Sequence, residues 1–138
     1  MTDYERLIQE ATDKGLKVKE TSLRNLDGLI KGNKIALRSD MTTTEKYCAL
    51  GEELAHHELT VGNILAQNKN KLEDVNNIKQ EYKAHALVIE KFVPIENILF
   101  ALADHHIEPW DMADYIGVTQ ELLMEALAYY KSKAVIIG

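Results

Sequence analysis

The stretch that decides the fold of this chain is TTTEKYCALGEELAHH, residues 42–57. Thr42 and Glu45 stand at capping-box spacing, in which each side chain satisfies a backbone N–H group at the start of a helix. Leu50 and Leu54 follow at helical spacing on one stripe. The sequence therefore predicts a long helix that begins at this box and ends near residue 59.

This helix carries a near-match to a zinc-binding motif. In His-Glu-x-x-His, two histidines four residues apart bind the metal from one helical face, and the Glu acts as a general base. Here Glu53 and His56 occupy the base and second-ligand positions, whereas Glu52 stands where the first histidine is expected. The sequence leaves open whether this replacement retunes the site or disables it.

A further ligand would come from another element. Residues 78–93 are predicted to form a helix that ends before Pro94, and they carry Glu81 and His85 at the same four-residue spacing. The candidate metal ligands are therefore Glu52, His56 and Glu81, with His57 and His85 in reserve.

A metal on these ligands would polarise a peptide carbonyl and activate a water, while Glu53 takes a proton and passes it to the leaving amine. Two carboxylates and one imidazole make a harder site than two imidazoles and one carboxylate. Such a site is expected to bind Zn²⁺ less tightly and to accept Mn²⁺ or Fe²⁺ better.

The alternative without a metal is a solvated helix face with Glu–His ion pairs one turn apart. His105 and His106 precede Pro109 in an expected loop and are interpreted as surface residues.

The remaining pattern predicts an α+β fold that is mainly helical. A helix is expected at residues 2–14, a β-hairpin at 26–37 around the turn Lys31-Gly32-Asn33-Lys34, and a polar surface loop at 63–77. Three short helices follow at 95–103, 109–116 and 119–131, and then an apolar tail with strand propensity. We expect one domain over 1–138, with a hairpin and metal-site part at 1–93, a helical part at 94–133 and the tail at 134–138.

Residues 110–127 have the outline of a helix-turn-helix, with Gly117 in the turn. The charge around them argues against sequence-specific DNA binding. Residues 94–133 contain seven acidic side chains and two lysines, a net charge of −5. Glu121 and Glu125 on the second helix would be repelled by phosphates. We interpret the segment first as a helical cap that closes the core and second as a protein-recognition surface. Direct nucleic-acid binding is not expected.

Composition agrees with a cytoplasmic, soluble protein. The 138 residues carry 16 Lys and Arg against 22 Asp and Glu, a net charge of −6, which is the wrong sign for whole-surface binding to DNA or an anionic membrane. The single Cys48 excludes an internal disulfide and suits a reducing compartment. Neither a secretory signal nor a membrane-spanning run is visible in the sequence.

The arrangement of these segments resembles the ImmA/IrrE family of phage and mobile-element metallopeptidases. The resemblance covers residues 3–133. It rests on the glycine-containing hairpin, the segment Leu50-Gly51-Glu52-Glu53-Leu54-Ala55-His56-His57, and Glu81-Tyr82-Lys83-Ala84 on a helix ended by Val93-Pro94. It implies a zincin-like active helix, with Glu53 as general base and with His56 and Glu81 as metal ligands. Glu52 falls on the position of the first histidine.

The resemblance also implies a function and a partner. Members of this family cleave or otherwise inactivate a phage-type transcriptional repressor, which relieves repression of the element that carries it. A metal-dependent peptidase acting on such a repressor is therefore expected. The alternative is a non-catalytic antirepressor that binds the repressor with the same scaffold. A DNA-binding regulator is a third interpretation, and the acidic C-terminal part disfavours it.

Overall fold

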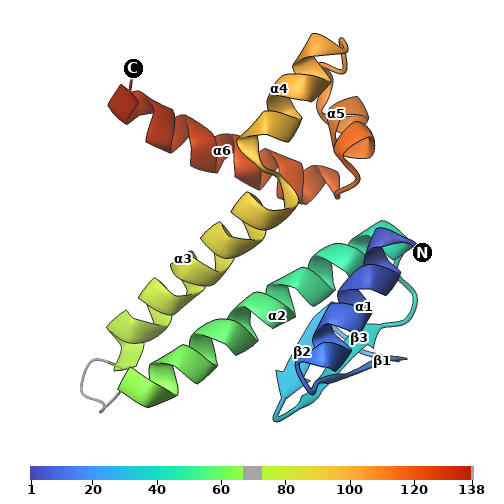
Figure 1. Ribbon diagram of the computed structural model, residues 1–138, viewed down its shortest axis with the longest axis vertical. Helices are drawn as coiled ribbons and strands as arrows, with labels where there is room; N and C mark the ends of the chain where they lie inside the picture. Colours follow the sequence, from blue (N-terminus) through green and yellow to red (C-terminus); the bar gives the residue numbers. More distant parts are fainter. Residues whose placement is uncertain (67–72, 138) are drawn as a thin grey trace. The chain divides into compact units, whose positions relative to one another are not determined.

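The computed structural model describes residues 1–66 and 73–137, and within them the side chains of residues 1–59 and 81–133. The chain is α+β and mainly helical (Figure 1). It divides into two compact units, residues 1–85 and 86–138. The elements are α1 (Asp3–Asp13), β1 (Lys17–Thr21), β2 (Gly28–Lys31), β3 (Lys34–Arg38), α2 (Thr43–Ala66), α3 (Glu73–Phe92), α4 (Ile95–Ala103), α5 (Pro109–Ile116) and α6 (Gln120–Ile137).

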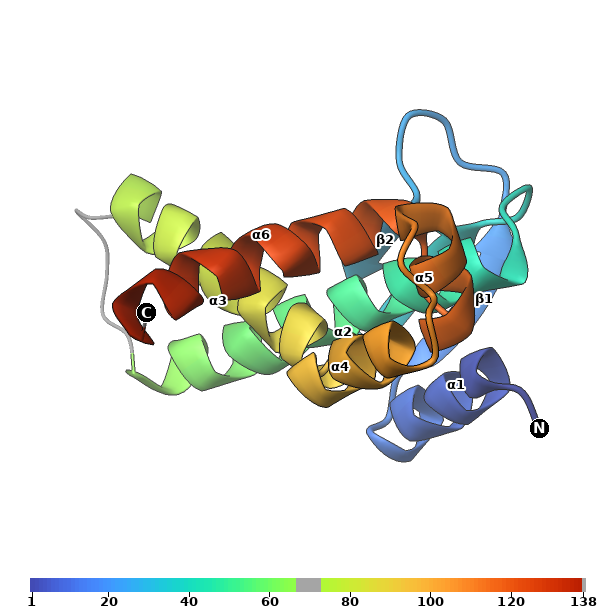
Figure 2. The same cartoon turned by 90° about the horizontal axis from the view of Figure 1, so that it is seen from above.

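The first unit contains a three-stranded sheet of order β1-β3-β2. The predicted hairpin is confirmed: β2 and β3 pair antiparallel through the turn at Gly32, whose φ of 61° is the left-handed conformation that glycine adopts readily. The sequence did not predict β1 as a strand. It pairs parallel to β3, and it reaches β2 through the open loop that is visible in Figure 2.

One face of the sheet packs against the helices of this unit. Ile35 and Leu37 alternate toward α2 and are 1% and 0% exposed, as the two-residue period of a strand requires. Helix α1 packs on both α2 and β1. At this junction Glu20 on β1 accepts hydrogen bonds from the Tyr4 hydroxyl (2.7 Å) and the Lys46 ammonium (2.8 Å). These bonds fix the start of α2 against the sheet.

The second unit holds the C-terminal helices, and the predicted bounds of α4 and α5 are confirmed. Helix α5 ends at Gly117, whose φ of 92° is left-handed, and Thr119 then caps α6 by accepting the N–H of Leu122. Leu122 and Leu123 on α6 are buried, as expected for helix anchors. The predicted turn between two helices is therefore present.

Two expectations about helix ends are wrong. The polar stretch 63–77 was expected to be a loop, yet α2 continues to Ala66 and α3 begins at Glu73, and only residues 67–72 lie outside the described part. The tail with strand propensity instead extends α6 to Ile137. In both cases the propensity penalties of Asn, Val and Ile amount to a few tenths of a kcal/mol each, and an established helix adds residues cooperatively.

The described residues were also searched for membrane spans. None of the helices within them combines the length and the apolar character that a membrane crossing needs.

Candidate metal site on helix α2

Helix α2 begins at the predicted capping box. The Thr42 N–H donates to Glu45 Oε1 over 2.8 Å, and the Glu45 N–H donates to Thr42 Oγ1 over 3.1 Å. Leu50 and Leu54 are buried on the stripe that faces the core. This packing fixes the rotation of the helix, so that Glu53 and His56, three residues apart, flank the buried stripe and are half-buried themselves.

The strand β2 makes room for Glu53 with a glycine. A Cβ atom added at Gly28 would lie 3.2 Å from Glu53 Cγ and 3.3 Å from Leu37 Cδ2, so these neighbours would have to move by a few tenths of an ångström. The first residue of β2 therefore lies directly against the side chain of the proposed base. Sequence reasoning did not identify Gly28 as a positioning residue, although a glycine within a strand is a known sign of close approach.

Burial controls the acidity of Glu53. Loss of solvent raises the pKa of its carboxyl group; the nearby His56 lowers this pKa to a smaller extent, and Glu81 raises it again. All three side chains therefore lie near enough to interact electrostatically. A carboxyl group with a raised pKa accepts and releases protons closer to neutral pH than an ordinary Glu.

His56 and Glu81 meet across two helices that run in opposite directions (Figure 1). The distance from His56 Nε2 to Glu81 Oε1 is 3.6 Å, and the two side chains are 31% and 72% exposed. Two protein atoms bound at about 2 Å to one tetrahedral Zn²⁺ lie roughly 3.3 Å apart. This pair therefore fits a shared metal ion. The same separation suits a simple ion pair with a protonated His56, which would stabilise an exposed surface little.

The other predicted ligands do not complete a cluster around this pair. Glu52 is exposed, and His57 and His85 are half-buried. Within the described residues, no three His, Cys, Asp or Glu side chains are arranged to hold one ion. The structure thus brings together His56 and Glu81, with Glu53 beside them, while the ligand role of Glu52 stays a prediction.

The histidines left out of the candidate set lie in the second unit. His105 is exposed and has a left-handed φ of 65°. His106 is half-buried; its Nδ1 lies 2.8 Å from Asp111 Oδ2, and its ring contacts that of Tyr115 at a centroid distance of 4.4 Å. This histidine joins the loop to the first turn of α5.

Comparison with known proteins identifies no relative of this chain: no family model, no curated protein and no solved structure matches it.

Proposed function

We propose that the first unit is a zincin-like, metal-dependent peptidase of the ImmA/IrrE type that acts on a phage-type transcriptional repressor. The observation that carries this proposal is the 3.6 Å separation of His56 and Glu81 from two different helices, with Glu53 beside them. A solvated helix face that carries Glu and His residues does not by itself require a carboxylate from a second helix beside His56. The order of these residues along the chain is the one that the motif requires.

The chain's own residues have distinct roles in this proposal. His56 and Glu81 hold the metal, which supplies Lewis-acid chemistry toward a peptide carbonyl when bound. Glu53 accepts a proton from the attacking water and delivers it to the leaving amine. Gly28 leaves room for the Glu53 side chain against β2, and partial burial holds the pKa of this carboxyl above the ordinary value. Glu52 is the proposed third ligand.

The second unit offers a surface that suits a basic protein partner. Seven acidic side chains are exposed there: Glu90, Glu96, Asp104, Glu108, Asp114, Glu121 and Glu125. Phe100, Ile107 and Trp110 are each more than 60% exposed in the same unit. Exposed aromatic anchors among like charges favour a partner that carries apolar groups and positive charge, such as the DNA-binding domain of a repressor.

The metal content of the purified protein tests the site. We expect about one Zn²⁺ or Mn²⁺ per chain in the wild type, and loss of the ion in His56→Ala and Glu81→Ala, because structural and catalytic sites need each protein ligand. His106→Ala is the matched control, since it removes a half-buried histidine from the other unit and should leave the metal content unchanged. Absence of metal after addition of either ion, or metal retained in His56→Ala, would contradict the proposal.

A second experiment separates catalysis from binding. Glu53→Gln should retain the metal and the repressor complex but lose cleavage, with a drop of about a hundredfold or more in rate for a missing general base.

The antirepressor alternative is favoured by the exposed Glu52 and by the incomplete ligand cluster within the described residues. It predicts stoichiometric inactivation of the repressor that survives both a chelator and Glu53→Gln.

A further inference from the structure

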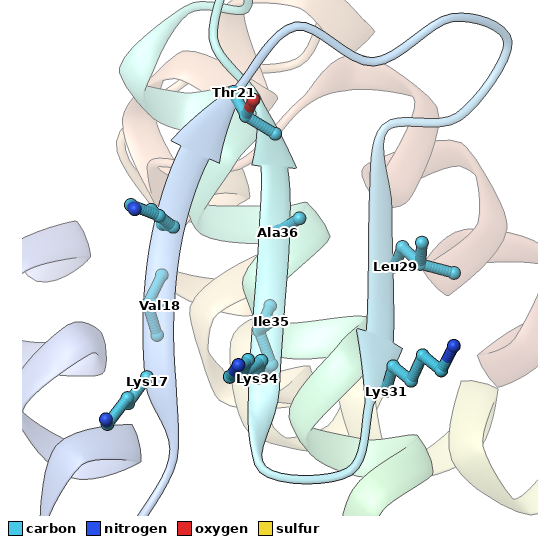
Figure 3. A pocket seen from close by; sticks show the side chains of 9 residues that line it. Lys17, Val18, Thr21, Leu29, Lys31, Lys34, Ile35 and Ala36 are labelled. Atoms are coloured by element: carbon cyan, nitrogen blue, oxygen red, sulfur yellow. The ribbon is translucent and has the colours of Figure 1, made fainter.

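The sheet has a second face that α2 does not cover, and this face is basic. Lys17 on β1, Lys31 on β2 and Lys34 on β3 are exposed there (Figure 3). Lys19 on β1 is exposed as well. Strand alternation assigns these side chains to the face opposite Ile35 and Leu37. The four lysines therefore share one surface, which we call the outer sheet face.

Three of these lysines form a row across the sheet. Lys17 pairs in register with Lys34, and Lys34 pairs with Lys31, so one positive charge stands on each of three adjacent strands. Neighbouring strands lie about 4.8 Å apart, and like charges directly opposite one another destabilise a sheet. In Figure 3 the Lys31 side chain points away from those of Lys17 and Lys34. Repulsion among these three lysines therefore lowers the stability of the folded chain unless an anion binds to the outer sheet face.

The charge of this segment contrasts with that of the whole chain. Residues 17–38 contain six Lys and Arg and two Asp and Glu, a balance of +4 in a chain of net charge −6. Arg38 on the same face is already paired with Asp27 and Asp40. For the four lysines, no ion pair with a carboxylate occurs among residues 1–59 and 81–133.

A depression of about 550 Å³ lies on this face. Its lining comprises the four lysines and Thr21, with Leu29 and Ala36 from the same face and with Val18 and Ile35, whose side chains alternate to the opposite face. No acidic residue is among them. Leu29 is 47% exposed. The volume is in the range of small-molecule sites, and an apolar floor with charged groups at its rim is their usual construction.

We propose that the outer sheet face binds a phosphorylated small molecule with a flat apolar body, the chemistry of a nucleotide. The phosphates would lie along the row of Lys17, Lys34 and Lys31, and the body would cover Leu29 and Ala36. A free phosphate would leave the apolar floor exposed. A nucleic-acid duplex is disfavoured, because its backbone would extend beyond this basic segment onto a chain that is acidic overall.

This site does not depend on the proposed peptidase function. It lies on the far side of the sheet from α2, and its test can be run without metal. Titration calorimetry of the full chain in EDTA would use ATP, inorganic pyrophosphate and a short DNA duplex as separate probes. We expect ATP to bind more tightly than pyrophosphate, since only ATP covers the apolar floor.

Matched variants locate the binding. The double change Lys17→Gln and Lys34→Gln should weaken ATP binding by about tenfold or more, because two of the three charges in the phosphate-binding row are lost. The double change Lys131→Gln and Lys133→Gln removes two exposed lysines from the other unit and should leave the affinity unchanged. Leu29→Ser should weaken ATP binding but not pyrophosphate binding. Circular dichroism would verify that each variant is folded.

Three outcomes would overturn the proposal. ATP that does not bind, or binds the outer-face variant as tightly as the wild type, would exclude the site. Pyrophosphate that binds as tightly as ATP would show that the apolar floor plays no part. Binding of the duplex alone would replace the small-molecule site with a nucleic-acid surface.

Discussion

Two histidine–carboxylate pairs in the described part of the chain are built in different ways. His106 and Asp111 are five residues apart and hydrogen-bonded at 2.8 Å, and both side chains are about one-third exposed. His56 and Glu81 come from two helices, are 25 positions apart, and stand 3.6 Å from each other with Glu81 largely exposed. His106 and Asp111 are joined by a hydrogen bond, whereas His56 and Glu81 lie slightly too far apart for one.

This difference separates a structural pair from a candidate ligand pair. A histidine whose ring nitrogen already bonds a neighbouring carboxylate at 2.8 Å fastens a loop to a helix start. A histidine and a carboxylate held slightly beyond hydrogen-bond distance have room for an ion between them. The arrangement of the second pair depends on how α2 and α3 are placed, so it should be the more sensitive to distant packing.

The largest expected effect comes from the packing behind α2. Leu37→Ala removes a fully buried side chain between the sheet and α2, and we expect it to lower the free energy of unfolding by about 2–5 kcal/mol. The NMR signals of the His56 ring should shift in this variant. Urea denaturation gives the stability. Leu29→Ala on the neighbouring strand is the control, because Leu29 is already 47% exposed and should cost far less. Equal losses in the two variants would contradict the assigned faces of the sheet.

A smaller effect is expected in the coupling free energies of the two histidine–carboxylate pairs, which can be compared directly. In a double-mutant cycle with His→Ala and carboxylate→Ala, His106 and Asp111 should show a coupling of about 1 kcal/mol, the contribution of a partly buried hydrogen bond. His56 and Glu81, measured in EDTA, should couple by roughly 0–0.5 kcal/mol, as exposed ion pairs do. Strong coupling of His56 to Glu81 without metal would mean that the pair is structural after all.

The smallest effect concerns the pH dependence of Glu53. Burial raises the pKa of this carboxyl in the folded chain, so its ionisation opposes folding. Its contribution to stability is complete below the ordinary Glu pKa of about 4.3 and is lost as pH rises through the folded value. Glu53→Gln cannot ionise, so the metal-free variant should melt at a higher temperature than the wild type at neutral pH.

This advantage should disappear in acid. Melting curves of the two metal-free proteins, recorded from neutral pH down to about pH 4, would follow the difference as Glu53 becomes protonated. A difference in melting temperature that stays constant over this range would show that burial of the Glu53 charge is not its cause.

Local signals in the sequence were sufficient for most of the secondary structure. The Thr42–Glu45 capping box, the turn glycines and Pro94 act over three or four residues, and the elements that they predict are present. Where the prediction depended on composition alone, it failed: the polar stretch 63–77 and the apolar tail both extend helices. Composition sets only weak preferences, which helix propagation overrides.

The sequence by itself determined the α+β class, the helix that carries Glu52, Glu53 and His56, and the position of Glu81 on a following helix. Only the tertiary structure decided that Glu81 meets His56, that Gly28 lies against Glu53, and that four lysines share one sheet face. The physical reason is the distance along the chain over which each interaction acts. Caps and turns depend on neighbours along the chain, whereas these contacts join residues that only the packing of strands and helices brings together.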